Sequence, residues 1–469
     1  MSEIAELSIA GAESRPITAE GLAGWIAEAR ALARLALPLM FTQLAQMAIM
    51  TTDIVMLGRL SSTALASATL GNTVFFLTWL IGFGPASAVS PMVAHVVGAN
   101  PNDRARVRHI ARMGLWSVLI VSLPLIAVLL FTQPILIALG QKPELARGAG
   151  AFTAALCLGL PASLGFQVLR NFTTALNRPT APLIVMAMAI AFNALADYTL
   201  IFGHFGFPKL GLVGSGTASA MSFTFTFLAM LGVISWTPAL RKYRILRRFW
   251  RPVWYELAEV FRLGMPIGLT TIFEAMMFNA ATLIMGTFGT ASLAAHQIAM
   301  NVPSITFMVP LGIAMAATVR VGMAAGRGDG HAVRRAGYSA ILMGVGFMAV
   351  TSTILWLIPD RIAALYLPHT AANAAVIRIA ITFLHVAAIF QIVDGLQVVA
   401  SLSLRGLKDA RAPMWIAGAS YWLAGAPMCA WLAFGEGMKG LGIWYGLAFG
   451  LTVAAVAMMA RFWLLSRRW

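Results

Sequence analysis

The stretch LALPLMFTQLAQMAIMTTDIVMLG, residues 35–58, decides the fold of this chain. It is long and apolar enough to cross a bilayer as a helix, with Pro38 near its start and the carboxylate of Asp53 near its end. The same design returns 228 residues later as LGMPIGLTTIFEAMMFNAATLIMG, residues 263–286. We therefore predict two copies of one membrane module. At this constant offset, identical residues stand opposite Arg34, Leu35, Pro38, Thr42, Gly58, Leu65, Ala66, Gly84, Ala88, Val93, Gly98 and Arg106.

The composition places the chain among polytopic membrane proteins. Of its 469 residues, 59% are hydrophobic and 11% are charged, whereas soluble domains carry about a quarter charged residues. We predict an all-α membrane protein with twelve transmembrane helices, because twelve apolar runs each match the thickness of a hydrocarbon core. The runs are 32–58, 66–96, 110–131, 149–170, 181–202, 212–236, 260–286, 292–320, 336–358, 374–402, 411–434 and 440–463.

The basic residues orient these spans. With the N-terminus inside, 26 of the 33 Lys and Arg residues fall in inner loops and ends and seven in outer loops, which leaves none at mid-membrane depth. Such asymmetry predicts cytoplasmic termini in the inner (plasma) membrane of a bacterium. It also explains the net charge of +16 without nucleic acid as a partner, since the charges lie scattered between apolar runs.

Each half contains an even number of spans, so both copies enter the membrane in the same direction. We expect two six-helix lobes related by a pseudo-two-fold axis along the membrane normal. The predicted parts are a cytoplasmic tail, with a short amphipathic helix around Trp25, then an N-lobe, a basic cytoplasmic linker, a C-lobe and a cytoplasmic C-terminus. Their limits are 1–31, 32–236, 237–259, 260–463 and 464–469.

Four carboxylates remain inside the spans: Asp53, Asp197, Glu274 and Asp394. A charged side chain there costs at least about 2.5 kcal/mol, and such residues persist where they face a cavity and bind something. Asn193 precedes Asp197 by one helical turn, so both share a helix face. We expect one site in each lobe for coupling to H+ or Na+ or for binding a cationic substrate. The structural alternative is an acid that is hydrogen-bonded across helices to Asn, Gln or Tyr.

Other side chains suggest a cavity and its hinges. Met adapts to many shapes and aromatic faces attract cations, and the chain has 26 Met, 27 Phe and 13 Trp residues. Most of these pack helices or meet lipid. Our candidates for the substrate cavity are Gln46, Phe278, Phe390 and Gln391. The hinge candidates are Pro38 and Pro266, because each opens a kink at the same place in its copy.

Five segments carry a likeness to a known family: TTDIVMLG (51–58), SPMVAHVVGA (90–99), FNALADYTLIFG (192–203), FEAMMF (273–278) and DGLQVVASLSLRGLKDAR (394–411). From about residue 30 to 463 the chain resembles the multidrug and toxic compound extrusion (MATE) family, closest to its NorM-like branch. The likeness implies two lobes in a V around a central cavity, and export of cationic, often aromatic compounds in exchange for H+ or Na+.

The resemblance also implies roles for single residues. Asp53, Asn193 and Asp197 match the N-lobe positions that couple a cation or proton, and Glu274 and Asp394 match the C-lobe cation site. Phe390 stands where some members have a tyrosine near the bound cation, which favours H+ over Na+.

We therefore predict a secondary active multidrug efflux antiporter that works by alternating access. Its expected partners are small cationic molecules and the bilayer, it acts as a monomer, and it needs no cofactor beyond the coupling ion, H+ or Na+. The sequence shows no metal-ligand set or Ser/His constellation of an enzyme. The alternative is a flippase for lipid-linked precursors from the same broader superfamily. A flippase requires basic residues in the cavity to hold phosphate groups, and the apolar runs contain none at mid-span.

Overall fold

The computed structural model describes residues 21–368, 370–371 and 373–468, and within these it contains helices and loops but no strand. The first half contains α2 (Leu22–Leu60), α3 (Ser62–Ala99), α4 (Arg104–Leu130), α5 (Thr132–Ala138), α6 (Pro143–Leu156), α7 (Leu160–Ala175), α8 (Thr180–Phe202), α9 (Gly211–Trp236) and the short α10 (Pro238–Arg241). A 3₁₀ turn, η1 (Cys157–Gly159), joins α6 and α7 into one span.

The second half repeats this order. It contains α11 (Trp254–Thr287), α12 (Thr290–Thr306), α13 (Met308–Gly326), α14 (Gly330–Leu357), α15 (Pro359–Tyr366), α16 (Ala374–Gly406) and α19 (Lys439–Ser466). Between the last two lie α17 (Arg411–Gly418), the π-helical η2 (Ala419–Gly425), α18 (Ala426–Ala430) and the π-helical η3 (Trp431–Gly435). The eighth span is broken at Phe307, whereas its counterpart α3 is continuous.

The predicted twelve-span all-α architecture is confirmed. Eleven helices among the described residues are long and apolar enough to cross a membrane. The twelfth crossing, predicted at 411–434, is the segmented run α17–η2–α18–η3, whose π-helical turns interrupt the α-helix. Several helices extend past the predicted spans: α2 absorbs the segment around Trp25, and α11 starts inside the predicted linker. The expectation for residues 1–20 of the tail lies outside the described residues.

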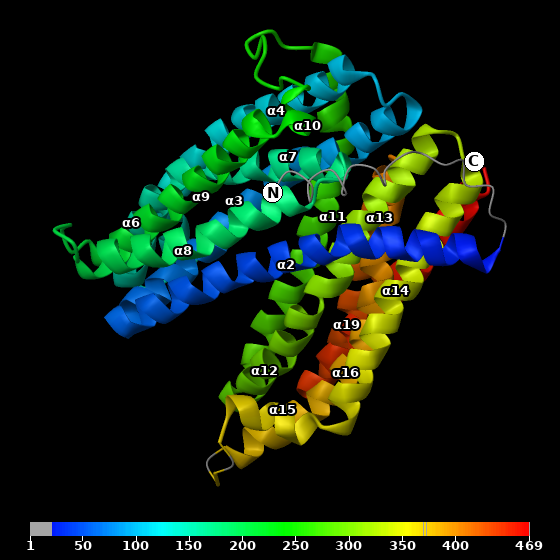
Figure 1. Cartoon of the computed structure of the whole chain (residues 1–469). Coiled ribbons are helices and arrows are strands. Elements are labelled where there is room, and N and C mark those ends of the chain that lie inside the picture. The colour runs from blue at the N-terminus through cyan, green and yellow to red at the C-terminus, as the bar shows by residue number, and fades with distance from the viewer. Residues whose placement is uncertain (1–20, 369, 372, 469) are drawn as a thin grey trace.

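The helices form two bundles that lie together near α11 and α13 and spread apart toward the lower left in Figure 1. The first helix of each repeat is shared between them. Helix α2 packs on α13 and α14 of the second half and on α8 of the first, and α11 correspondingly packs on α3 and α4 as well as on α12 and α19. Because each half places its first helix against the other half in the same way, the two halves are related by an approximate two-fold symmetry.

Matching glycines hold the two bundles together at the closed end of the V. A Cβ atom on Gly98 of α3 would overlap the carbonyl oxygen of Met323 in α13, and one on Gly326 of α13 would overlap that of His95 in α3. Both pairs are related by the 228-residue offset of the sequence repeat. Only a glycine permits this closeness, which explains why glycine occupies this position in both copies.

The same reciprocity recurs deeper in the membrane. Gly84 of α3 lies against the backbone of Gly264 and Gly268 in α11, and its counterpart Gly312 of α13 lies against the backbone of Met40 in α2. These contacts place the N-terminal half of each shared helix on the opposite bundle. Two of the three identical glycine pairs of the repeat, 84/312 and 98/326, therefore mark contacts between the lobes, whereas Gly58 and Gly286 do not.

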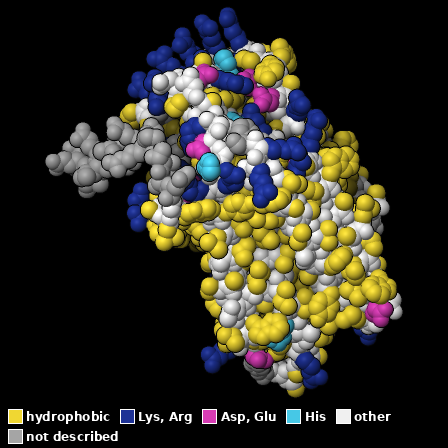
Figure 2. All heavy atoms as spheres, turned by 90° about the vertical axis from the view of Figure 1, so that its right-hand side faces the viewer, with side chains coloured by type: hydrophobic (Ala, Val, Ile, Leu, Met, Phe, Trp, Pro, Cys, Tyr) yellow, Lys and Arg dark blue, Asp and Glu magenta, His cyan; other side chains and the backbone are white. Residues whose placement is uncertain are grey.

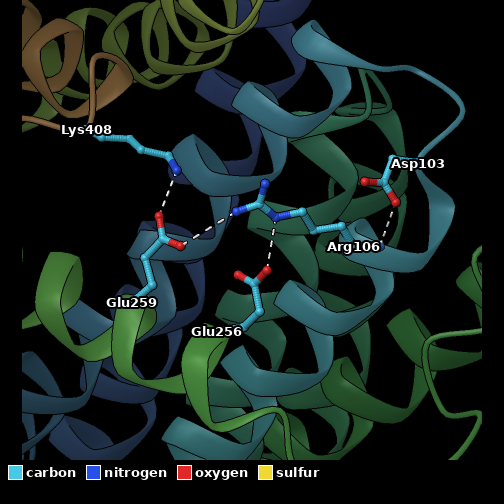
Figure 3. A network of polar contacts seen from close by, with 5 residues as sticks. All are labelled: Asp103, Arg106, Glu256, Glu259 and Lys408. Carbon is cyan, nitrogen blue, oxygen red and sulfur yellow. Dashed lines mark hydrogen bonds and ion pairs between the residues drawn. The ribbon is translucent and has the colours of Figure 1, made fainter.

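Ion pairs reinforce the closed end of the V (Figure 3). Arg106 of α4 contacts Glu256 at 3.0 Å and Glu259 at 3.9 Å, both on α11, and Lys408 in the loop after α16 contacts Glu259 at 2.8 Å. Glu259 therefore links α4 of the first half to the end of α16 in the second. On the other shared helix, Glu28 of α2 is paired with Arg320 of α13, and Glu28 and Glu256 are again 228 residues apart.

The surface fits a membrane-embedded molecule. Figure 2 shows Lys and Arg side chains gathered over one end and a broad hydrophobic surface below them. Large apolar side chains are widely exposed, among them Leu123 at 73% and Leu283 at 77%. A soluble monomer rarely leaves so much contiguous apolar area uncovered. The chain is therefore a multi-pass membrane protein.

Candidate functional site

A central cavity of ≈ 720 Å³ lies between the two bundles. Its walls come from α2, α3 and α7 of the first half and from α11, α12, α13 and α16 of the second. The volume is within the range of small-molecule sites. Since both halves contribute walls, any movement of one lobe against the other changes the shape of this space.

Two of the predicted acids face this cavity. Glu274 of α11 and Asp394 of α16 both line it and lie close enough to each other to interact electrostatically. Neither forms an ion pair within 4 Å with a described residue. The buried phenol of Tyr421, on the π-helical η2, lies within electrostatic range of both and has no hydrogen-bond partner in the described structure. The C-lobe site therefore combines two carboxyls with a phenol.

Three of the four cavity candidates line the cavity: Gln46, Phe278 and Phe390. The rings of Phe278 and Phe390 meet edge to face, with centroids 6.0 Å apart. Gln391 does not line the cavity. Its side chain is fully buried and accepts a hydrogen bond of 3.1 Å from the Thr306 hydroxyl. Gln391 lies one helical turn before Asp394, but its side chain bonds Thr306 of α12 and does not line the cavity.

The N-lobe acids form a separate cluster. Asp53 of α2 lies beside Asn193 and Asp197 of α8, and the hydroxyl of Ser219 on α9 lies 3.4 Å from Asp53 Oδ2. Asn193 and Asp197 are fully buried, and their polar side chains face that of Asp53. None of these four residues lines the central cavity. The acids thus group in pairs as predicted, but only the C-lobe pair meets the space between the bundles.

Two arginines also line the cavity, Arg170 of α7 and Arg405 of α16. This corrects the expectation that the cavity contains no basic residue. Both were assigned to inner loops because the apolar runs end before or at them, but α7 continues to Ala175 and α16 to Gly406. Arg405 interacts electrostatically with Glu274, so one acid has a distant cationic neighbour.

The family of this chain follows from comparison of its sequence with models of known protein families. The MatE family model matches residues 38–199 and 266–431. The chain belongs to the MatE family. The two matched segments begin at Pro38 and Pro266, at the offset of the internal repeat, and together they contain all four intramembrane acids. The family recognised in the sequence is therefore confirmed.

Several MatE relatives are similar over nearly the whole chain. "Probable multidrug resistance protein NorM" of Brucella suis is 44% identical, with 93% of each chain covered. The protein of the same name from Rhizobium meliloti is 44% identical, with 95% of each covered. Among solved structures, the eukaryotic MATE transporter AtDTX14 has a TM-score of 0.84 at 21% identity, covering 95% of this chain and 98% of its own. That structure supports the MatE fold alone.

The prolines of the MatE repeat sit inside the two shared helices. The hydroxyl of Thr42 donates to the carbonyl oxygen of Pro38 at 2.7 Å, and that of Thr270 donates to the carbonyl oxygen of Pro266 at 2.8 Å. Proline removes a backbone hydrogen bond, and such threonine bonds tend to bend a helix. Both prolines lie near the contacts of α2 and α11 with the opposite bundle, where a bend would move one lobe against the other.

Sequence reasoning missed three residues of this MatE site. Arg170 and Arg405 were lost through the assignment of the span ends. Arg170 could have been found from its spacing in the sequence. Gln167, Arg170 and Thr174 are three and four residues apart, so they share a polar face of α7, and all three line the cavity. Tyr421 left no comparable signal, because its approach to Glu274 and Asp394 depends on how α17–η2 packs on α11 and α19.

Proposed function

We propose that this MatE protein is a secondary active multidrug efflux antiporter, which exports cationic, aromatic compounds in exchange for H+ by alternating access. The observation that carries the proposal is a pair of carboxyls, Glu274 and Asp394, that face a cavity between the two lobes and form no ion pair with a described residue. The names of the relatives support the multidrug character. In cells that lack other exporters, expression should lower the accumulation of the cationic dye rhodamine 123. Accumulation equal to that of the empty vector contradicts the proposal.

The lining of the cavity suits such compounds. A cation gains electrostatic energy from a carboxylate in a site of low dielectric, and it is attracted to aromatic faces. Trp79 and Phe83 on α3, with Phe278 on α11 and Phe390 on α16, provide those faces, and Met47 and Met50 of α2 add adaptable walls. The C-lobe acids are thus the proposed substrate-binding groups.

The N-lobe acids are the proposed carriers of the coupling proton. Two adjacent carboxyls cannot both be ionised cheaply in a buried place, so the pair of Asp53 and Asp197 holds a proton or a bound cation. The cluster lies outside the lining of the central cavity, so proton and drug occupy different places. Competition between them then acts through the conformation of the lobes, since a ligand shifts an equilibrium only by its differential affinity for the two states.

An Asp197→Asn variant separates these two roles. Asparagine keeps the shape of the side chain but removes the shared proton, so we expect no uphill export driven by a pH gradient. Rhodamine 123 should still bind, because Glu274 and Asp394 are unchanged, but its affinity should no longer vary with the protonation of position 197. Dye export in proteoliposomes and fluorescence polarisation of the purified protein measure the two quantities. Retained pH-driven export would exclude Asp197 as a coupling residue.

The closed end of the V is the proposed cytoplasmic gate, because Lys and Arg side chains gather there (Figure 2) and such residues favour the cytoplasmic side. The structure then represents an outward-facing state in the inner membrane, with both termini in the cytoplasm. The contacts of Gly98 with Met323 and of Gly326 with His95, together with the link through Glu259, hold this gate shut. Opening requires these contacts to break while the lobes rotate.

A Glu259→Gln variant should weaken the gate. It removes both arms of the link from Arg106 to Lys408, and these partly exposed pairs together contribute about 1 kcal/mol. The ratio of gate-closed to gate-open molecules should therefore fall about fivefold. Distances between spin labels attached through Arg104→Cys and Arg411→Cys report that ratio. The matched control is Asp409→Asn, which breaks the pair of Asp409 with Arg461 inside one lobe and should leave the ratio unchanged. An equal effect of both variants would contradict a gating role for Glu259.

A flippase for lipid-linked precursors is the second candidate, and the two arginines of the cavity favour it. The sequence argument against it was the absence of basic residues from the cavity, and that argument is wrong because Arg170 and Arg405 line it. Competition for bound rhodamine 123 distinguishes the two. Displacement by tetraphenylphosphonium but not by farnesyl pyrophosphate supports the exporter, and the reverse supports the flippase.

A further inference from the structure

The central cavity contains a charge that the export of simple cations does not use. Arg170 of α7 lines the cavity and is only 4% exposed. Its Nη1 donates a hydrogen bond of 2.6 Å to Gln43 Oε1 of α2, while its Nε is buried with no partner in the described structure. A cation-binding site gains nothing from a fixed positive charge in its wall, so this arginine needs another explanation.

No described carboxylate forms an ion pair with Arg170. The described residues that line the N-lobe part of the cavity include neither Asp nor Glu. The other well-buried arginine of this lobe also has an Nε with no partner among the described residues, but it does not line the cavity. Arg112 of α4 is 3% exposed, but its Nη1 donates to the backbone carbonyls of Arg247 and Arg248. Arg112 therefore fastens the linker, whereas Arg170 retains donor capacity at a cavity wall.

Further unpaired donors lie beside Arg170. Thr174 follows one helical turn later on α7, and Ser87 stands on the neighbouring helix α3. Both line the cavity, and both hydroxyls are buried without a hydrogen-bond partner among the described residues. The side-chain amide of Asn171 donates 2.9 Å to the carbonyl oxygen of Ala86, which holds the two helices together at this point. Three donors without a partner among the described residues, on Arg170, Thr174 and Ser87, therefore belong to the same wall of the cavity.

This arrangement is complementary to an anion. A guanidinium with neighbouring hydroxyl donors matches the oxygens of a carboxylate, and buried polar groups without partners are costly unless a ligand satisfies them. The opposite lobe supplies Glu274 and Asp394 to the same cavity. The cavity between the lobes therefore has both acids, with Arg405 near Glu274, in its C-lobe wall and the guanidinium of Arg170 in its N-lobe wall.

We propose that Arg170, with Ser87 and Thr174, forms a subsite for the carboxylate of a substrate, so that the cavity selects zwitterions over simple cations. The inference rests on the proposed function, because it assigns the cation of the same molecule to Glu274 and Asp394. The carboxylate satisfies the unpaired donors of the N-lobe while the cationic part meets the acids of the C-lobe. A zwitterion thereby links both lobes across the cavity.

Two dyes differ in this feature alone. Rhodamine 123 is the methyl ester of rhodamine 110, so the first is a cation and the second carries a free carboxylate on the same aromatic body. Binding of each dye to the purified full-length protein is followed by fluorescence polarisation. The variants are Arg170→Gln, Arg170→Lys and, as a matched loss of a buried arginine away from the cavity, Arg112→Gln. Thermal unfolding in detergent verifies that each is folded.

Arg170→Gln should weaken rhodamine 110 binding by about tenfold or more, as expected for loss of a charge-assisted hydrogen bond, and change rhodamine 123 binding by less than about twofold. Arg170→Lys should recover part of the rhodamine 110 affinity, and Arg112→Gln should leave the ratio of the two affinities unchanged. Equal losses for both dyes, or no loss for either, would overturn the subsite. The proposed function is tested separately by Asp394→Asn in the otherwise wild-type protein. If this variant binds rhodamine 123 as tightly as the wild type does, the proposed function is wrong. If Arg170→Gln does not fold, the Arg170→Lys and Thr174→Val variants provide the test. Each should lower the affinity for rhodamine 110 relative to that for rhodamine 123, and an unchanged ratio would overturn the subsite.

Discussion

Binding and export of rhodamine 123 are expected to collapse in an Asp394→Asn variant. Asparagine has nearly the same shape as aspartate, so the cavity keeps its form, but the charge that holds the cation is gone. Loss of a charged interaction of this kind costs about 1.5–3 kcal/mol, which predicts an affinity lower by about tenfold or more. Fluorescence polarisation with purified protein and dye accumulation in cells measure the two effects.

The control for this variant is Asp360→Asn. Asp360 is an exposed acid on α15 and does not line the central cavity, so its loss should change neither binding nor accumulation. Glu274→Gln should resemble Asp394→Asn, since both acids face the same space. Wild-type affinity and export in both cavity variants would remove the C-lobe acids from substrate binding.

A Gly98→Ala variant should be unable to close the gate. The added Cβ would overlap the carbonyl oxygen of Met323, and backbone cannot move aside as a side chain can. Such overpacking costs about 1–3 kcal/mol, enough to lower the ratio of gate-closed to gate-open molecules by about fivefold or more. The spin-label distances between positions 104 and 411 should lengthen, and efflux should fall. Gly326→Ala should act in the same way, because the contact is reciprocal.

Gly346→Ala is the matched control. It places the same methyl group on a glycine of α14 that has open space around it. Export and label distances should match the wild type, apart from the small gain in helix propensity that alanine brings. Unchanged distances and transport in Gly98→Ala and Gly326→Ala would mean that the closed end of the V is not a gate.

Much of the fold could be predicted from the internal sequence repeat. Two of the glycine pairs that matched at one offset, 84/312 and 98/326, lie at the lobe contacts, because close approach of two backbones tolerates little else. The acids could be located for a similar reason, since an unpaired carboxylate in an apolar run is too costly to retain without a purpose. These features are local in sequence and can therefore be recognised without coordinates.

The residues that the sequence analysis missed or misplaced have two physical causes. An apolar run ends where lipid contact ends, but a helix that lines an internal cavity continues with polar residues, as α7 does through Arg170 and α16 through Arg405. Hydropathy cannot distinguish that case from a loop. The position of Gln391 behind the wall and of Tyr421 beside the acids depends on helix rotation and packing, which single-chain patterns do not contain.

The most direct test of the account is export of rhodamine 123 from proteoliposomes with a pH gradient or a Na+ gradient imposed separately. The account predicts uphill dye movement with the pH gradient, none with Na+ alone, and none in the Asp394→Asn variant under either gradient. Equal dye movement by wild type and Asp394→Asn, or no response of the wild type to the pH gradient, would contradict it.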